Sequence, residues 1–163
     1  MEFFLKSIAI QIIVFFIIFQ FLSFIKQIDM LSTDTSMASE QFVLETTIGQ
    51  TVSLTPTKKT VLYFFAPWCS VCHASIGNLQ AVYEKNPHID VIAIGLDFIE
   101  QEEVDRFVSR HQLTFPVAYG NESIKKAYKV LGYPSYYIID EQNTVISKSM
   151  GYSTEIGLYI RSL

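Results

Sequence analysis

Two spacings of apolar residues divide most of this chain into expected strands and helices. Short apolar runs between turn-forming residues indicate strands, and apolar positions repeated every three or four residues indicate amphipathic helices. Strands are expected at residues 42–44, 52–54, 61–66, 89–96, 135–139 and 144–149, and helices at residues 69–85, 100–111, 123–131 and 154–162. Because strands alternate with helices before a final antiparallel pair, the pattern predicts an α/β fold with helices on both faces of a central mixed sheet. The first two strands flank Gly49 and predict an N-terminal β-hairpin.

The N-terminal segment is apolar on every side. Residues 8–25 contain no charge, and an uncharged helix of that length approaches the thickness of the hydrocarbon layer. A helix that is apolar all round is typical of a membrane span rather than of a small globular core. We therefore expect a single transmembrane helix within residues 1–25, which contacts the lipid bilayer through residues 3–25. A polar tether over residues 26–40 and one domain over residues 41–163 are expected to follow.

A cleaved signal peptide is the alternative interpretation of the same segment. Its apolar region would be about 7–15 residues long, and a small-residue cleavage site would follow soon after. The apolar run here is longer, and the small-residue site Ser36-Met37-Ala38 lies far downstream. We therefore favour an uncleaved anchor, although lysines on both sides of the span specify its orientation only weakly.

The charge balance argues against a nucleic-acid partner. Half of the 163 residues are apolar, only 17% are charged, and the net charge is −4. The chain has no basic stripe, and its lysine pairs at residues 58–59 and 125–126 are isolated. Since nucleic-acid affinity depends on clustered Lys and Arg contacts with phosphates, we expect no nucleic acid to bind.

The two cysteines carry the clearest chemical signal. Cys69 and Cys72 are the only ones in the chain, and they follow the apolar strand at residues 61–66 where a helix begins. A C-x-x-C pair in a βαβ context predicts a redox-active disulfide, with no further cofactor and no metal. At a helix N-terminus, unpaired N–H groups and the helix dipole favour a thiolate on Cys69. We therefore expect Cys69 to attack substrates and the more covered Cys72 to resolve the mixed disulfide.

Three segments together resemble the thioredoxin superfamily, and within it the membrane-anchored TlpA/ResA/DsbE-like proteins. They are Ala66-Pro67-Trp68-Cys69-Ser70-Val71-Cys72, Leu113-Thr114-Phe115-Pro116-Val117, and Gly132-Tyr133-Pro134-Ser135 with the strand after it. The resemblance spans about residues 41–160 and implies a thioredoxin-like fold with protein disulfide oxidoreductase activity. It also implies protein thiol or disulfide substrates, a membrane redox partner and a role of the cytochrome c biogenesis type. A single-pass protein of the bacterial inner (cytoplasmic) membrane, with its catalytic domain facing the periplasm, fits that group.

The resemblance also implies how substrates are positioned. Pro134 is expected to have a cis peptide bond and to lie opposite the cysteine pair. The cis bond would turn the backbone of Tyr133 outward, where it can pair with an extended substrate segment. Trp68, next to the cysteine pair, is expected to shield the site. These three residues are therefore the expected substrate-positioning residues.

One departure from the family pattern concerns proton transfer. Many relatives carry an acidic residue in the strand before the motif or in the first turn after it, but this chain has Tyr63 and Ser75 there. The sequence therefore shows no proton acceptor for Cys72. Whether the pair oxidises, reduces or isomerises its substrates stays open, because the reduction potential depends on the balance between thiolate and disulfide.

Two other chemistries use the same short motif. Residues 69–73 match the C-x-x-C-H pattern of c-type haem attachment, in which His73 would ligate the iron. A copper-handling thioredoxin-like protein is the other alternative, although the two cysteines and His73 supply few local ligands. The buried strand before the motif and the Gly-Tyr-Pro segment after it favour disulfide exchange over both. Without a haem, His73 either lends positive charge to the thiolate or, as we favour, faces solvent; His88 and His111 are given no role.

Overall fold

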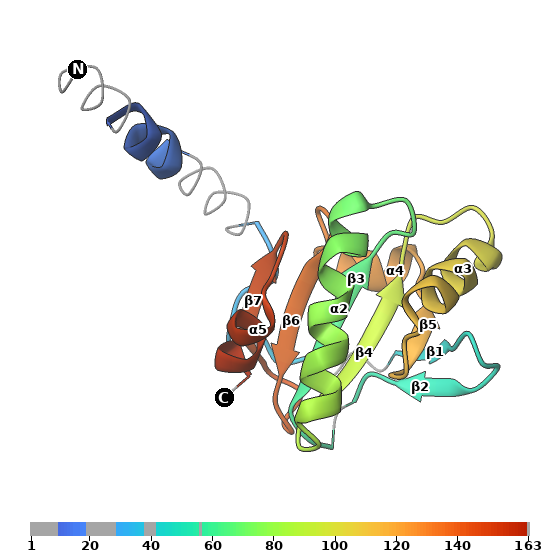
Figure 1. Cartoon of the computed structure of the whole chain (residues 1–163). Helices are drawn as coiled ribbons and strands as arrows, with labels where there is room; N and C mark the ends of the chain where they lie inside the picture. The colour runs from blue at the N-terminus through green and yellow to red at the C-terminus, as the bar shows by residue number, and fades with distance from the viewer. Residues whose placement is uncertain (1–9, 19–28, 38–41, 56, 163) are drawn as a thin grey trace.

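The computed structural model describes residues 10–18, 29–37, 42–55 and 57–162, and it confirms the predicted α/β architecture (Figure 1). The strands are β1 (Val43–Glu45), β2 (Thr51–Ser53), β3 (Thr60–Phe65), β4 (Asp90–Gly95), β5 (Val117–Tyr119), β6 (Ser135–Ile139) and β7 (Val145–Met150). The helices between and after these strands are α2 (Ser70–Lys85), α3 (Gln101–His111), α4 (Glu122–Ala127) and α5 (Glu155–Arg161). Strands β1 and β2 pair antiparallel around Gly49, whose φ of 71° suits glycine, so the predicted hairpin is confirmed.

The five-stranded sheet places β3 at its centre, in the order β5-β4-β3-β6-β7. Strand β3 runs parallel to β4 and antiparallel to β6, and β7 returns antiparallel to β6. All β3 residues are buried, as expected for an apolar run covered on both faces. The sheet is therefore mixed, as predicted, and the carboxyl end of its central strand leads into α2.

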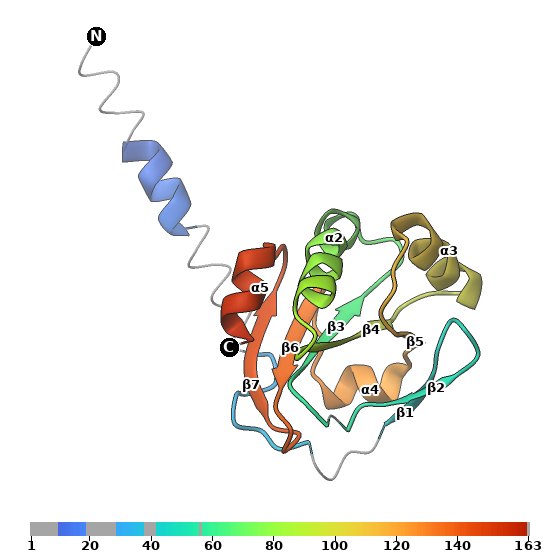
Figure 2. The same ribbon diagram turned by 60° about the horizontal axis from the view of Figure 1, so that its bottom comes forward.

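Helices cover both faces of this sheet, with α2, α3 and α5 on one face and α4 on the other (Figure 1 and Figure 2). Alternate β3 side chains supply the two cores, because successive side chains of a strand point to opposite faces. Tyr63 and Phe65 pack in the core beneath α2 and α3 with Phe107, whereas Leu62 and Phe64 pack in the core that includes α4. The sheet thus holds α2, and with it the cysteine pair, on one side.

Two elements differ from the sequence prediction. The sequence does not predict β5, because three residues are too few to show a two-residue period. Helix α4 ends at Ala127 rather than near residue 131. Lys129 has a φ of 46°, in the left-handed region, and the Val130 N–H donates to the Lys125 carbonyl, which ends the helix there.

The predicted membrane anchor falls largely on residues 1–9 and 19–28, which lie outside the described ranges. Residues 10–18 form a helix, and their apolar side chains are exposed (Figure 1). Within the described ranges, no helix is both long enough and apolar enough to cross a membrane. The division of the chain into anchor, tether and domain stays a prediction.

Part of the predicted tether packs against the domain. Met30 and Met37 are 1% and 3% exposed, and both belong to the core on the α4 side of the sheet. Ser36 forms a β-bridge with Thr144, next to β7. Residues 29–37 therefore extend the packed structure beyond the predicted start of the domain. The sequence does not show this, because the few apolar residues of the stretch follow no period.

Gly120, which follows β5, has no room for a side chain. A Cβ atom there would lie 2.6 Å from side-chain atoms of both Ile94 and Leu96 and 2.8 Å from the Gly95 carbonyl oxygen. Over-packing of this kind costs about 1–3 kcal/mol. We expect Gly120→Ala to lower the free energy of unfolding of the oxidised protein by about 1–3 kcal/mol, as measured by urea denaturation.

Gly77 offers a matched control within α2. Nothing lies within 4 Å of the position that its Cβ would take. Because glycine inside a helix is less favourable than alanine, Gly77→Ala should raise the free energy of unfolding by roughly 0.5–1 kcal/mol. Equal effects of the two substitutions would contradict the close approach at Gly120.

Candidate active site

The cysteine pair lies where the central strand turns into a helix. Cys69 and Cys72 form a disulfide, and their Cα atoms are 5.2 Å apart. Strand β3 ends at Phe65 and α2 begins at Ser70, so the pair spans the turn between them and the first turn of the helix. In open α/β sheets, reaction sites lie at this carboxyl edge. The predicted pair is therefore present, bonded, and in the predicted place.

Cys69 is the N-cap residue of α2. Its backbone is extended, with φ and ψ of −78° and 108°, and its Sγ accepts a hydrogen bond from the Cys72 N–H at 3.1 Å. The first turn of α2 contains no acidic side chain that would oppose a negative charge. Once the disulfide is reduced, the free N–H groups and the positive end of the helix dipole favour a thiolate at this position.

The two cysteines differ in accessibility. Cys72 is fully buried, whereas Cys69 is 7% exposed. Trp68 and Val71, which flank Cys69 closely in sequence, are exposed at the surface. A substrate sulfur can therefore approach Cys69 more readily than Cys72.

The segment expected to face the cysteine pair has the predicted cis peptide bond, between Tyr133 and Pro134. The register of β3 and β6 pairs Phe64 with Ser135, which puts Pro134 at the same end of the sheet as the cysteine pair. The Trp68 and Tyr133 rings meet edge to face, with their centroids 5.9 Å apart. The structure thus brings the three expected positioning residues together, and their contact with a substrate stays a prediction.

Asp97, in the loop between β4 and α3, connects these residues, although nothing in the sequence singles it out. Its backbone carbonyl accepts a hydrogen bond from the Trp68 indole N–H at 2.9 Å. Its carboxylate accepts hydrogen bonds from the Tyr133 hydroxyl at 3.0 Å and from the Lys125 ammonium at 2.7 Å. Burial raises the pKa of Tyr133, and the contact with Asp97 adds to the shift, so the phenol stays a neutral donor.

Behind the disulfide, three hydroxyl groups occupy the region where the family resemblance leads us to expect an acid. The Tyr63 hydroxyl donates to the Cys72 backbone carbonyl at 3.4 Å, and the Tyr136 hydroxyl donates to Ser75 Oγ at 3.2 Å. All three side chains are buried. Burial raises the pKa of Tyr136 to about 12 and raises that of Tyr63 well above its usual value. The interior side of the pair therefore carries neutral hydroxyls at these positions.

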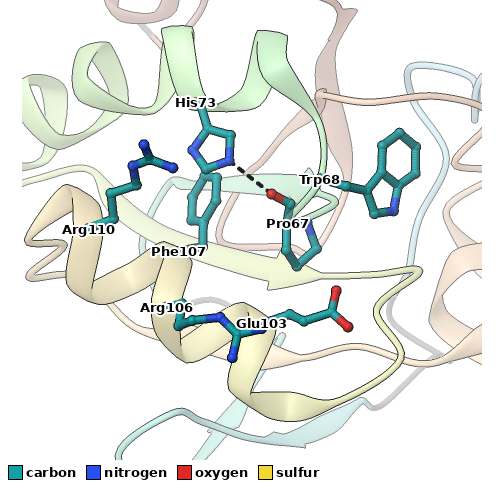
Figure 3. A pocket seen from close by; sticks show the side chains of 7 residues that line it. All are labelled: Pro67, Trp68, His73, Glu103, Arg106, Phe107 and Arg110. Atoms are coloured by element: carbon teal, nitrogen blue, oxygen red, sulfur yellow. Dashed lines mark hydrogen bonds between the residues drawn. The ribbon is translucent and has the colours of Figure 1, made fainter.

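On another side of the motif, a cavity of about 270 Å³ opens between α2 and α3 (Figure 3). Its walls include His73, Arg106 and Arg110. His73 is half-buried in this wall, so the solvent-facing interpretation of that residue is wrong. Its Nε2 lies 2.9 Å from the Pro67 carbonyl oxygen, and its Nδ1 lies 2.7 Å from Nε2 of His111. A residue without a predicted role, His111, is therefore part of the surroundings of the motif.

The same contacts bear on the two alternative chemistries. Both ring nitrogens of His73 are hydrogen-bonded, so ligation of a haem iron would have to break one of these bonds. Among the residues that the structure describes, no group of three or more His, Cys, Asp or Glu side chains is placed to hold a metal ion. These two observations do not decide between disulfide exchange, haem attachment and copper handling. Haem attachment and copper handling therefore stay alternative hypotheses.

Sequence comparison relates the chain to a known family. The model of the AhpC/TSA family matches residues 36–148. Thioredoxin-like protein YneN of Bacillus subtilis is 30% identical over 119 residues, which cover 70% of this chain and 70% of YneN. Thiol-disulfide oxidoreductase ResA of Oceanobacillus iheyensis is 35% identical over 85 residues, which cover 50% of this chain but only 44% of that protein.

A solved structure has the same fold. StoA from Bacillus subtilis matches with a TM-score of 0.69 at 22% identity, over 76% of this chain and 96% of StoA. At that identity the likeness establishes the thioredoxin-like fold alone. The family model, however, covers well over half of the chain, and the match to YneN covers more than two thirds of both proteins. The chain therefore belongs to the AhpC/TSA family, and its relatives include a thioredoxin-like protein and thiol–disulfide oxidoreductases.

Proposed function

We propose that this protein exchanges disulfides with protein substrates, with Cys69 as the attacking sulfur and Cys72 as the resolving one. The observation that carries the proposal is the N-cap position of Cys69, whose Sγ receives the Cys72 N–H. Helix N-termini stabilise thiolates, and the thiolate is the nucleophile in disulfide exchange. The complete burial of Cys72 supports the division of roles, because a substrate must first reach Cys69.

The exchange takes two steps when it starts from the reduced protein. The Cys69 thiolate attacks one sulfur of a substrate disulfide, forms a mixed disulfide with it and releases the other sulfur as a thiolate. Cys72 then loses its proton and attacks Cys69 Sγ, which closes the Cys69–Cys72 disulfide and releases the second substrate sulfur as a thiolate. Two electrons pass to the substrate. The reverse sequence oxidises a substrate dithiol and reduces the protein.

We assign the positioning of the substrate to Trp68, Tyr133 and Pro134. The exposed Trp68 ring and the half-buried Tyr133 ring form a wall near Cys69, and both are hydrogen-bonded to Asp97. An extended substrate segment would run along this wall and pair with the Tyr133 backbone next to the cis bond. The aromatic wall would then hold the substrate sulfur over Cys69.

The cellular setting is part of the same proposal. The uncharged apolar stretch at residues 8–25 supports a membrane anchor. Stable disulfides form outside the cytoplasm, which supports a catalytic domain facing the periplasm from the bacterial inner membrane. A membrane redox partner would restore the redox state of the cysteine pair after each turnover. A role in cytochrome c biogenesis rests on the family resemblance alone.

Replacement of the resolving cysteine should trap the substrate. In Cys72→Ala the mixed disulfide through Cys69 has no internal thiol to resolve it, so it should accumulate. We expect non-reducing gel electrophoresis of the reduced variant, incubated with a disulfide-bonded protein, to show an adduct that dithiothreitol removes. Mass spectrometry should place the bond at Cys69.

Cys69→Ala is the matched control, because it keeps the fully buried sulfur and removes the more accessible one. This variant should form no comparable adduct. An adduct through Cys72 at a similar rate would reverse the proposed roles. A Soret band or bound copper in the purified wild-type protein would instead favour one of the alternative functions.

Asp97 should matter more for protein substrates than for small ones. Asp97→Ala removes the acceptor of the Tyr133 hydroxyl and the partner of Lys125 but keeps the carbonyl that holds Trp68. Because ion pairs this close to the surface contribute up to about 1 kcal/mol, kcat/KM with a protein disulfide should fall roughly fivefold. The rate with a small aromatic disulfide, which needs only Cys69, should barely change.

Tyr133→Phe tests the same contact from the other side. It keeps the ring beside Trp68 and removes only the hydrogen bond to Asp97, so it should reproduce part of the loss with protein substrates. Equal losses with protein and small disulfides would show that Asp97 supports the fold of the site rather than the position of the substrate.

A further inference from the structure

We propose that His73 and His111 share one proton next to the active-site motif and thereby make the reactivity of Cys69 respond to pH. His73 lies one helical turn after Cys69 on α2, and His111 is the last residue of α3. Neither takes part in the two exchange steps described above. The inference rests on the proposed role of Cys69 as the attacking sulfur.

The contacts of the two imidazole rings fix where their protons lie. The Pro67 carbonyl oxygen can only accept, so His73 Nε2, which is 2.9 Å away, carries a hydrogen. In the neutral ring, His73 Nδ1 then has no hydrogen and accepts from His111 Nε2 at 2.7 Å. A chain of two hydrogen bonds therefore runs from His111 through His73 to Pro67.

This chain can take up one further proton without losing a hydrogen bond. The proton adds to the free Nδ1 of His111, and the hydrogen between the rings can then lie on either nitrogen of the 2.7 Å contact. A second added proton would set two N–H groups against each other across that contact. The pair therefore holds a single positive charge, which both rings can share.

Neighbouring charges determine the pH at which this charge forms. Partial burial lowers the pKa of His111, and the neighbouring His73 and Arg110 lower it further. Arg106 and Arg110 line the same cavity as His73, and both oppose a further positive charge (Figure 3). Glu103 also lines this cavity, but its carboxylate accepts from backbone N–H groups at the start of α3. These neighbours therefore move proton uptake at His111 to a lower pH than that of an ordinary histidine.

The added charge acts on Cys69 in one direction. Apart from His73, the titratable groups of residues 66–75 are Cys69 and Cys72, and this segment includes Pro67, which the His73 ring contacts. A neighbouring cation favours the thiolate of a cysteine. When the pair gains its proton at lower pH, the added positive charge therefore lowers the pKa of Cys69. Cys69 should stay reactive to a lower pH than it would beside two uncharged side chains.

The pair also holds the turn that carries Cys69. The His73 ring bonds to the carbonyl of Pro67, two residues before Cys69, and the ring packs on Phe107 with centroids 4.6 Å apart. A charged donor makes a stronger hydrogen bond than a neutral one. Protonation of the pair therefore strengthens the hydrogen bond to the Pro67 carbonyl at acid pH, where the Cys69 thiolate is least favoured.

The rate of Cys69 alkylation measures this effect. Reduced protein is treated with iodoacetamide, which forms a thioether with the thiolate and releases iodide, at pH values from about 4 to about 9 around the usual histidine and cysteine pKa values. The variants are His73→Gln and His111→Gln, because glutamine can donate a hydrogen bond but carries no charge. His88→Gln is the matched control, since His88 is exposed and lies just before β4, at the opposite end of the sheet.

We expect both variants to lose reactivity at a higher pH than the wild type, with a roughly tenfold lower rate on the acid side for the loss of one nearby charge. The profile of His88→Gln should match that of the wild type. A wild-type profile for His111→Gln would overturn the inference, even if His73→Gln failed to fold. Mass spectrometry separates the two failures: label on Cys72 contradicts the proposed roles of the cysteines, whereas label on Cys69 with unchanged profiles contradicts only the histidine pair.

Discussion

The redox chemistry depends on one constraint, that α2 begins directly after the central strand. The Cys69 N–H donates to the Ala66 carbonyl at 3.0 Å, so a single tight turn separates the end of β3 from the N-cap of the helix. This turn places Cys69 Sγ where it accepts a hydrogen bond from the Cys72 N–H. Ile76 and Leu79 fix the helix on the sheet from below, and both are fully buried. A shift of α2 by one residue would place a different side chain at the N-cap, so the packing of the helix matters to the chemistry as much as the sulfur atoms do.

The same edge of the sheet gathers side chains that are far apart in the chain. Strands β3 and β4 run parallel with Phe65 opposite Gly95, so the loops that follow them leave the sheet side by side. One loop carries Trp68 and the other Asp97, and their hydrogen bond closes the gap between them. Tyr133 lies just before the antiparallel strand β6, and its hydroxyl donates to the Asp97 carboxylate. The pairing of the strands therefore brings these segments together, and hydrogen bonds from their side chains hold the site in place.

This explains how much the sequence could predict. Long elements with a clear period, such as β3 and α2, follow from the spacing of apolar residues alone. The C-x-x-C spacing identifies the cysteine pair, and the family resemblance implies the cis bond. The short strand β5 and the packed residues 29–37 lack a period. The roles of Asp97 and of the histidine pair depend on contacts between separate loops and helices, for which a single sequence carries no signal. The membrane anchor stays a prediction from composition, because most of it lies outside the described residues.

The disulfide lies between two polar environments that respond differently to pH. Behind it, burial raises the pKa of Tyr63 and of Tyr136, so their hydroxyls stay neutral across the physiological range. In front, the half-buried pair of His73 and His111 can gain a charge, because part of it remains in contact with water. Acid–base control therefore comes from the surface side rather than from the interior. It follows that the proton of Cys72 does not pass to either of the two interior tyrosines. In the second exchange step Cys72 must therefore lose its proton to a base outside this interior cluster, and substrate sulfurs of lower pKa should leave more readily as thiolates.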